Sequence, residues 1–434
     1  MPVVRDLRGL SSLPGFRRLL AVRLLSQGAD GIFQVALAAY VVFSPEKETS
    51  PAAIAWAMAV LLLPYSLVGP FAGVLLDRWR RRQVLLYGNL LRALLAGATA
   101  ALILVSVPDW LFYLSALSVT AINRFVLSAL SAALPRVVDT DEQLVLGNSI
   151  SPTAGTIAAS AGGGVAFIVR LAGPDGRAAD ALTVIVGAGV YLCAAVVATS
   201  MRPGLLGPDP GFVQPRLRAA VASTARGLVA GVRHLAERPV AARALGAMAL
   251  MRFCYGGLLV MVLMLCRYAW TDNNKEALAL LGFAVGLSAA GFFIAAVITP
   301  WMVSRLGRLG WMGLCAAIAA VALPALALPF DRKPILVAAF VLGLVTQGSK
   351  IATDTVVQSS VDDGFRGRVF SLYDMLFNVA FVGAAGVAAL LLPADGRSVG
   401  LVVMVTLIYA AVSWAMFHVK RDPLWRPDAV SRET

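Results

Sequence analysis

Charged side chains interrupt several of the longest apolar stretches of the chain. They are Asp30, Arg92, Arg124, Arg252, Lys350, Asp354 and Asp374. An ionised group is costly inside a hydrocarbon layer unless it is paired or wetted, so such groups mark ion or substrate pathways by default. The carboxylates among them could bind and release protons, and an approaching cation would favour release.

Asp30 is the acid that lies deepest in an apolar run. It follows Arg18 by twelve residues, which is about 18 Å along a helix that rises 1.5 Å per residue. Gln27 and Gln34, at i−3 and i+4, share its helical face. We therefore expect Asp30 at the bilayer midplane, on a polar stripe.

A second polar stripe runs through the apolar segment 334–360. Its members are Thr346, Gln347, Lys350, Asp354 and Gln358. Lys350 and Asp354 stand four residues apart on one helical face and can pair directly. We expect this pair to be structural, and we expect Asp354 and Asp374 to lie in the cytoplasmic third of their spans.

The composition predicts a membrane setting for these charges. The chain has 434 residues, of which 59% are hydrophobic and 14% are charged. A soluble domain is about 45–50% apolar and about 25% charged, so this chain has too little polar surface to coat a soluble particle. A spanning helix needs about 20 apolar residues, and the apolar runs are continuous rather than alternating, which excludes a β-barrel. The predicted class is an all-α, polytopic membrane protein.

Turn and charge signals separate the apolar segments. The twelve runs lie near residues 16–43, 52–76, 83–107, 110–136, 144–172, 180–201, 241–268, 277–304, 310–330, 334–360, 367–392 and 398–419. Arginines spaced among apolar residues in the longest polar gap predict a basic amphipathic helix on the membrane surface. The predicted organisation is an N-terminal six-helix half at 1–201, a cytoplasmic linker at 202–240, a C-terminal six-helix half at 241–420 and a cytoplasmic tail at 421–434.

Lysine and arginine predict the orientation. The net charge is +13, and with the amino terminus inside, about 24 cations fall on the inner side and about 8 on the outer side. This distribution predicts a multi-pass protein of the cell membrane with both termini cytoplasmic. It also explains the positive charge without a nucleic-acid partner.

Other chemistries have little support in the sequence. The four cysteines lie in apolar runs, and neither His234 nor His418 stands near a cysteine or carboxylate cluster, so we expect no metal or haem site. No nucleophile–base constellation indicates an enzyme, and no Gly-x-x-x-x-Gly-Lys-Ser/Thr loop indicates ATP drive. We expect no cofactor.

The segment after the second run carries a recognisable motif. Residues 73–82 read Gly-Val-Leu-Leu-Asp-Arg-Trp-Arg-Arg-Arg and resemble the Gly-x-x-x-Asp-Arg-x-Gly-Arg-Arg signature of the major facilitator superfamily, with Arg80 where the family usually has glycine. About 227 positions later, residues 304–308 read Ser-Arg-Leu-Gly-Arg, a weak internal repeat. The resemblance implies twelve transmembrane helices in two six-helix halves related by pseudo-two-fold symmetry.

The same signature implies a conformational gate. In the family, its aspartate faces the amino-terminal end of helix 11 and steadies the outward-open state. That role would pass to Asp77, with Gly73 allowing the second span to approach a neighbour closely. The expected gate residues are Gly73, Asp77, Arg78, Arg81, Arg366 and Arg368.

The fifth run is rich in small residues. Residues 147–156 read Gly-Asn-Ser-Ile-Ser-Pro-Thr-Ala-Gly-Thr and resemble a degenerate form of a drug/proton antiporter motif. The glycines at 162–164 offer a competing register without the proline. Either register would make this helix thin and bendable. A generic small-residue packing face explains the pattern equally well, so both interpretations stay open.

In the superfamily, helices 1, 4, 7 and 10 line a central cavity. The expected cavity or substrate residues on these helices are Gln27, Phe33, Gln34, Arg124, Phe125, Arg252, Tyr255, Gln347 and Lys350, with Tyr373 and Asn378 added from the eleventh run. We expect Arg92 to belong to a buried packing pair, because helix 3 usually backs the cavity helices. Buried packing pairs and ordinary aromatic packing remain the alternative for the others.

Residues 26–34, 123–125 with 134–135, and 365–370 resemble the bacterial macrolide- and siderophore-exporter branch. This resemblance implies a secondary active transporter that exports amphiphilic small molecules by alternating access, coupled to protons. It would act as a monomer among membrane lipids. The alternatives are a lysolipid or glycolipid flippase of the same fold, or a non-transporting membrane sensor or scaffold.

Proton coupling requires a buried carboxylate whose proton affinity changes as access to the cavity alternates. Asp30 is the first candidate, with Asp354 and Asp374 as the others. We expect Arg124 or Lys350 to be the cation that approaches Asp30.

Overall fold

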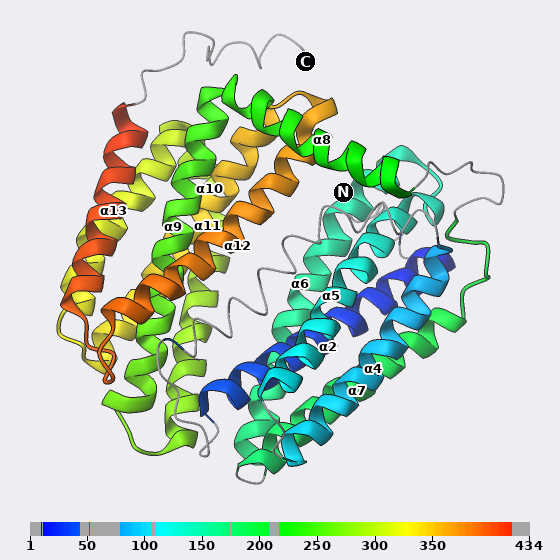
Figure 1. The fold of residues 1–434 in the computed structure, drawn as a ribbon. Coiled ribbons are helices and arrows are strands. Elements are labelled where there is room, and N and C mark those ends of the chain that lie inside the picture. Colours follow the sequence, from blue (N-terminus) through cyan, green and yellow to red (C-terminus); the bar gives the residue numbers. More distant parts are fainter. Residues whose placement is uncertain are drawn as a thin grey trace. The chain divides into compact units, whose positions relative to one another are not determined.

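The computed structural model of the chain describes residues 10, 12–43, 52, 79–105, 109–173, 176–207 and 217–418. All regular secondary structure in these ranges is helical (Figure 1). Nine helices within them are long and apolar enough to cross a bilayer. The chain is thus an all-helical membrane protein. The predicted span at 52–76 falls almost wholly outside the described residues, so the count of twelve stays a prediction.

The described residues form two compact units. One reaches to Val229 and includes Asn273–Leu278, and the other comprises Ala230–Asp272 and the residues from Ala279 onwards. The first contains α2 (Pro14–Phe43), α4 (Arg81–Val105), α5 (Asp109–Ala133), the short η1 (Leu134–Arg136), α6 (Asp141–Ala172) and α7 (Arg177–Thr199). The second contains α9 (Pro239–Met264), the π-helical η2 (Leu265–Ala269), most of α10 (Asn274–Ala327), α11 (Arg332–Ser360), α12 (Asp363–Leu391) and α13 (Val399–His418).

The helix boundaries follow local chemistry. At the start of α6, the Thr140 hydroxyl accepts a hydrogen bond from the Gln143 backbone N–H at 3.2 Å and caps the helix. Within α10, Gly307 has φ 73°, a conformation that glycine adopts without steric cost. The kink lies between the predicted runs 277–304 and 310–330, so α10 covers both of them.

In the first unit, α2 and α6 pack with almost no side chain between their backbones. A Cβ added to Gly31 would overlap the Ala159 carbonyl oxygen, and one added to Gly162 would overlap that of Gly28. A Cβ on Gly155 would overlap the Gln27 side chain. Both glycine registers of the fifth run therefore face α2, which is how small residues let membrane helices approach.

The second unit repeats this arrangement. A Cβ on Gly256 of α9 would come within 3.0 Å of Phe381 on α12, and one on Gly343 of α11 would overlap the Ser288 carbonyl oxygen of α10. The first helix of each half thus packs on the fifth, α2 on α6 and α9 on α12. This correspondence fits the internal repeat in the sequence.

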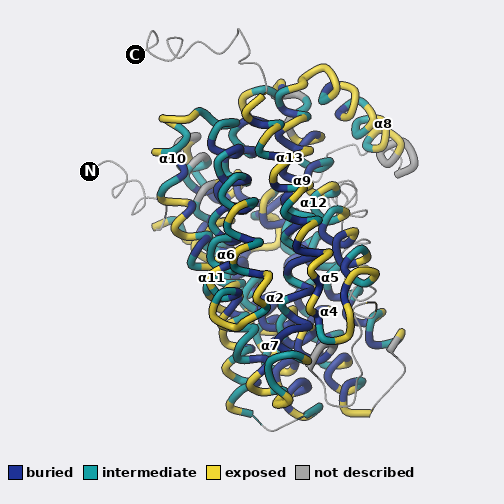
Figure 2. Tube along the Cα trace, turned by 90° about the vertical axis from the view of Figure 1, so that its left-hand side faces the viewer, coloured by how far each residue is buried: buried dark blue, intermediate teal, exposed yellow. Residues whose placement is uncertain are grey.

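Figure 2 maps exposure along the trace; the exposed residues include many large apolar side chains, and the buried ones include charged groups. Large apolar side chains such as Leu390 (86%) and Val297 (78%) are exposed, whereas Arg92 (0%) and Asp180 (0%) are buried. Lipid as the surrounding solvent favours this distribution, because apolar groups then face the hydrocarbon and charges must be enclosed or wetted.

The predicted amphipathic segment forms α8 (Leu217–Ala236). Its carboxyl end contacts the junction of α11 and α12 within the second unit. The His234 ring stacks on Phe365 with centroids 4.3 Å apart. Just beyond α8, Arg238 donates to both oxygens of Asp362 at 3.0 and 3.1 Å.

Candidate functional site

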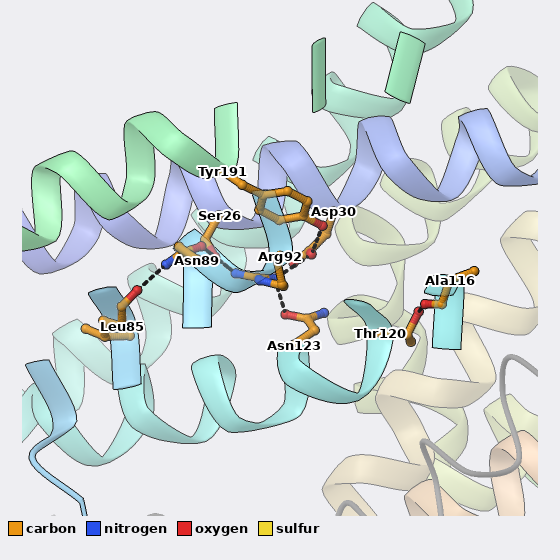
Figure 3. Close-up of polar contacts among 9 residues, drawn as sticks. All are labelled: Ser26, Asp30, Leu85, Asn89, Arg92, Ala116, Thr120, Asn123 and Tyr191. Atoms are coloured by element: carbon orange, nitrogen blue, oxygen red, sulfur yellow. Dashed lines mark hydrogen bonds and ion pairs between the residues drawn. The ribbon is translucent and has the colours of Figure 1, made fainter. Parts of the chain in front are cut away.

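A buried ion pair joins α2 to α4 in the first unit (Figure 3). The Arg92 Nη1 lies 2.7 Å from Asp30 Oδ1, with the arginine fully enclosed and the Asp30 side chain 8% exposed. Ser26 and Asp30 are four residues apart on α2, and Asn89 and Arg92 are three apart on α4. These spacings place each pair on one helical face, so the two faces meet as complementary polar surfaces.

The guanidinium of Arg92 has further neutral acceptors. Its Nη1 donates to Asn123 Oδ1 of α5 at 3.1 Å, and its Nη2 donates to Asn89 Oδ1 at 2.6 Å and to the Ser26 hydroxyl. The Asn89 amide in turn donates to the Leu85 carbonyl at 2.7 Å. Arg92 can therefore remain hydrogen-bonded even when its interaction with Asp30 weakens.

The two oxygens of Asp30 have different surroundings. Oδ1 accepts from Arg92 and also from the Tyr191 hydroxyl of α7 at 2.6 Å. Oδ2 is buried and has no hydrogen-bond partner among the described residues. The Tyr191 ring covers the guanidinium, with its centroid 4.4 Å from Arg92 Cζ. This one-sided arrangement leaves Oδ2 as the atom on which a proton could reside.

A second group of polar residues lies in the second unit. Lys350 Nζ and Asp354 Oδ2 of α11 are 2.7 Å apart, with side chains 39% and 28% exposed. The ammonium also lies 5.9 Å from the centre of the Tyr373 ring on α12. The i,i+4 pair expected from the sequence is therefore formed, and it is partly open to its surroundings.

Arg252 of α9 lies among aromatic rings. Its Cζ is 4.2 Å from the ring centres of Phe377 and Phe381 on α12 and 5.2 Å from that of Tyr255. The Tyr255 hydroxyl lies 3.4 Å from the Ser288 hydroxyl of α10. The second unit thus combines a cation, apolar rings and an ion pair on α9, α11 and α12.

Sequence comparison identifies the family. Residues 19–385 match the profile of the Major Facilitator Superfamily. The chain belongs to this superfamily. An uncharacterized MFS-type transporter of Mycobacterium tuberculosis is 37% identical over 410 residues, covering 93% of this chain and 91% of the relative, and one from Mycobacterium bovis matches equally well. The protein is therefore a membrane transporter and not an enzyme.

Solved structures agree on the fold of this superfamily member. A peptide transporter, POT, aligns with a TM-score of 0.68 at 13% identity, covering 94% of each chain. A D-xylose-proton symporter aligns with a TM-score of 0.65 at 13% identity, covering 93% of this chain and 96% of its own. The nucleoside transporter NupG gives 0.64 at 15% identity, covering 93% and 99%. Sequence identities this low establish the fold alone.

The structure corrects one expectation about this transporter. Arg124 or Lys350 was expected to approach Asp30, and Arg92 was expected to form a buried packing pair with an unnamed partner. The cation that pairs with Asp30 is Arg92, while Lys350 pairs with Asp354. On α5 it is Asn123 that faces the pair. Arg124, the next residue, is turned by about 100° around the helix and is half-buried.

The other residues of the α2 stripe have separate surroundings. Gln27 packs against Gly155 of α6, Gln34 is exposed, and Phe33 is enclosed at 2% exposure. Phe125 packs against the apolar core of the first unit. The shared helical face predicted from spacing is therefore divided between buried and exposed environments.

The remaining predicted residues are distributed over both units. On α11 and α12, Gln347 and Asn378 are half-buried and Asp374 is exposed; the Asn378 amide donates to the Asp374 carbonyl at 3.1 Å. Among the gate residues, Arg81 donates to the Leu206 carbonyl at 3.1 Å and Arg368 lies 5.1 Å from the Phe365 ring. Arg366 belongs to α12; its side chain, like Gly73, Asp77 and Arg78, lies outside what the structure describes.

Four members of the Asp30 network were not predicted as site residues. They are Ser26, Asn89, Asn123 and Tyr191, and each contacts Asp30 or Arg92. The spacing of Asn89 and Arg92 on one face of an apolar helix was a usable signal. Tyr191, which is 161 residues from Asp30, had no comparable local pattern around it.

Proposed function

We propose that this transporter exports amphiphilic small molecules in exchange for protons, and that Asp30 carries the coupling proton. The observation that supports this most strongly is the asymmetry of the Asp30 carboxylate. One oxygen is held by Arg92 and Tyr191, and the other is buried without a partner among the described residues. A buried ionisable group inside a membrane span is a candidate for ion coupling.

Protonation at this carboxylate has a direct structural consequence. A proton on Oδ2 removes the negative charge, and the attraction to Arg92 falls with it. Arg92 then keeps its hydrogen bonds to Asn89, Asn123 and Ser26. The contact of α2 with α4 and α7 would weaken while Arg92 keeps hydrogen-bond acceptors. Proton binding is in this way linked to the arrangement of the helices.

An amphiphilic cargo is supported by the second unit. Lys350 and Asp354 are partly exposed in the second half of α11, and charges inside a span normally face a water-filled cavity rather than lipid. The neighbouring rings of Tyr373 and Phe377 are 5.9 Å apart at their centres. Polar and aromatic groups side by side suit a molecule with one polar end and one apolar end.

Energised everted membrane vesicles provide the test. Antibiotics, siderophores and lysolipids are added one at a time, and collapse of the pH gradient is followed with an acridine dye. We expect at least one amphiphile to dissipate the pH gradient in vesicles that contain the wild-type protein, and none to do so in vesicles that contain Asp30→Asn. Asp395→Asn, a change of the same type in the partly exposed Asp395–Arg397 pair, is expected to keep the response.

Two results would remove the proposal. One is a response that persists in Asp30→Asn at normal expression. The other is movement of lysolipid or glycolipid between leaflets that is indifferent to the pH gradient, which is the result expected of a flippase.

A further inference from the structure

Arg252 is a cation for which the described part of the chain provides no carboxylate within ion-pair distance. It follows Pro239, the first residue of α9, by thirteen residues, which is about 20 Å along the helix and therefore deep in the span. Its Nε is buried and has no hydrogen-bond partner there. An arginine at this depth normally pairs with an acid or with backbone carbonyls.

Two acids of this unit lie on the helices next to α9. Asp354 of α11 already binds Lys350 at 2.7 Å, and Asp374 of α12 is exposed. What surrounds the guanidinium instead are the rings of Tyr255, Phe377 and Phe381. Rings stabilise the positive charge through their faces, but a guanidinium has five N–H donors in a planar fork, and ring faces are poor substitutes for oxygen acceptors.

Oxyanions complement this arrangement. Carboxylate, sulfonate and phosphate groups can accept two parallel hydrogen bonds from one guanidinium, which gives orientation as well as attraction. The three rings would at the same time contact the apolar part of a molecule held by its charged end. A lysine ammonium would provide the same positive charge, but it lacks the planar set of N–H donors that makes two parallel hydrogen bonds to one oxyanion.

We propose that Arg252 is the recognition site for an anionic group of the substrate, whose apolar body packs on Tyr255, Phe377 and Phe381. This rests on the proposed function, since it concerns the cargo of the same transporter, and it narrows that cargo from amphiphiles in general to anionic amphiphiles.

Equilibrium binding to the full-length protein in phosphatidylcholine nanodiscs tests this without any gradient. The probes are anilinonaphthalene sulfonate and phenylnaphthylamine, which share an aromatic skeleton and differ in the sulfonate. Protein-free nanodiscs give the lipid background. We expect Arg252→Met to weaken sulfonate binding by about tenfold or more and to leave the neutral probe within about twofold. Arg252→Lys should fall between wild type and Arg252→Met.

Arg243→Met is the matched control, because Arg243 lies on the same helix and is exposed. It should bind both probes as the wild type does. The melting temperature of Arg252→Met should be unchanged or higher, because the substitution removes a cation that lacks an acidic partner.

Three outcomes would overturn the proposal: equal loss of both probes in Arg252→Met, an unchanged preference for the sulfonate in that variant, or the same loss in Arg243→Met. Because no proton gradient is applied, the failure of Asp30 as a proton carrier would leave this result unaffected. Conversely, loss of the anionic site would leave substrate-driven proton movement for another cargo intact.

Discussion

Asp30 and Arg92 meet at 2.7 Å between α2 and α4, and only one of the two Asp30 oxygens takes part. The pair combines a structural contact with a free protonation site. Its energetic importance follows from burial, since an ion pair enclosed in this way is costly to break from one side.

Removing one partner should reveal that cost. We expect Arg92→Met to lower the free energy of unfolding in detergent by about 3–5 kcal/mol, because Asp30 is then a buried charge without its cation. The double variant Asp30→Asn/Arg92→Met should recover more than half of the loss. A double-mutant cycle measured by reversible denaturation checks this, and additive losses would show that the two residues are not coupled.

Tyr191 is expected to hold Asp30 through its hydroxyl. Tyr191→Phe keeps the ring 4.4 Å from Arg92 Cζ and deletes the 2.6 Å hydrogen bond. A hydrogen bond to a charged group contributes about 1.5–3 kcal/mol, so we expect a loss of that size in the same unfolding assay.

The buried Tyr409 of α13 provides the comparison for Tyr191. Its hydroxyl lies 3.5 Å from the Met251 carbonyl, a long contact with a neutral group. Tyr409→Phe should therefore cost less than about 1 kcal/mol. Equal losses in the two variants would argue against a special interaction of Tyr191 with Asp30.

Two glycines of α6 should respond oppositely to alanine. In Gly162→Ala the new methyl overlaps the Gly28 carbonyl oxygen of α2, whereas a methyl on Gly164 meets nothing within 4 Å. We expect Gly162→Ala to destabilise the protein by about 1–3 kcal/mol or more and Gly164→Ala to be neutral or to stabilise it by up to about 1 kcal/mol. Thermal melting of both variants measures this, and similar melting temperatures would contradict the close α2–α6 packing.

The distribution of cations predicts the topology. Reporter fusions at Gly176, Asn273 and Gly396 should report the outside, and fusions at 202–240 or after Arg421 should report the inside. Phosphatase and fluorescent-protein fusions give opposite signals on the two sides. A cytoplasmic signal at both Gly176 and Asn273 would contradict the six-plus-six organisation.

The sequence predicted what depends on local pattern. Continuous apolar runs predicted the helical membrane fold, the Ser-Arg-Leu-Gly-Arg segment coincides with the kink at Gly307, and the i,i+4 spacing predicted the Lys350–Asp354 pair. What local pattern did not indicate was Arg92 as the partner of Asp30. Which face of α4 meets α2 is decided by packing between the helices. Neighbouring residues such as Asn123 and Arg124 point about 100° apart around their helix. A cation at the same depth in the membrane as Asp30 can therefore point away from it.

Proton coupling requires that Asp30 itself takes up a proton, and this can be measured without knowing the substrate. Infrared difference spectroscopy of the reconstituted protein during acid titration detects the C=O stretch of a protonated carboxylic acid. We expect such a band in the wild type and in Asp354→Asn, and its absence in Asp30→Asn at equal folding. A titrating band that is unchanged in Asp30→Asn would show that the proton is carried elsewhere and would contradict the proposed coupling.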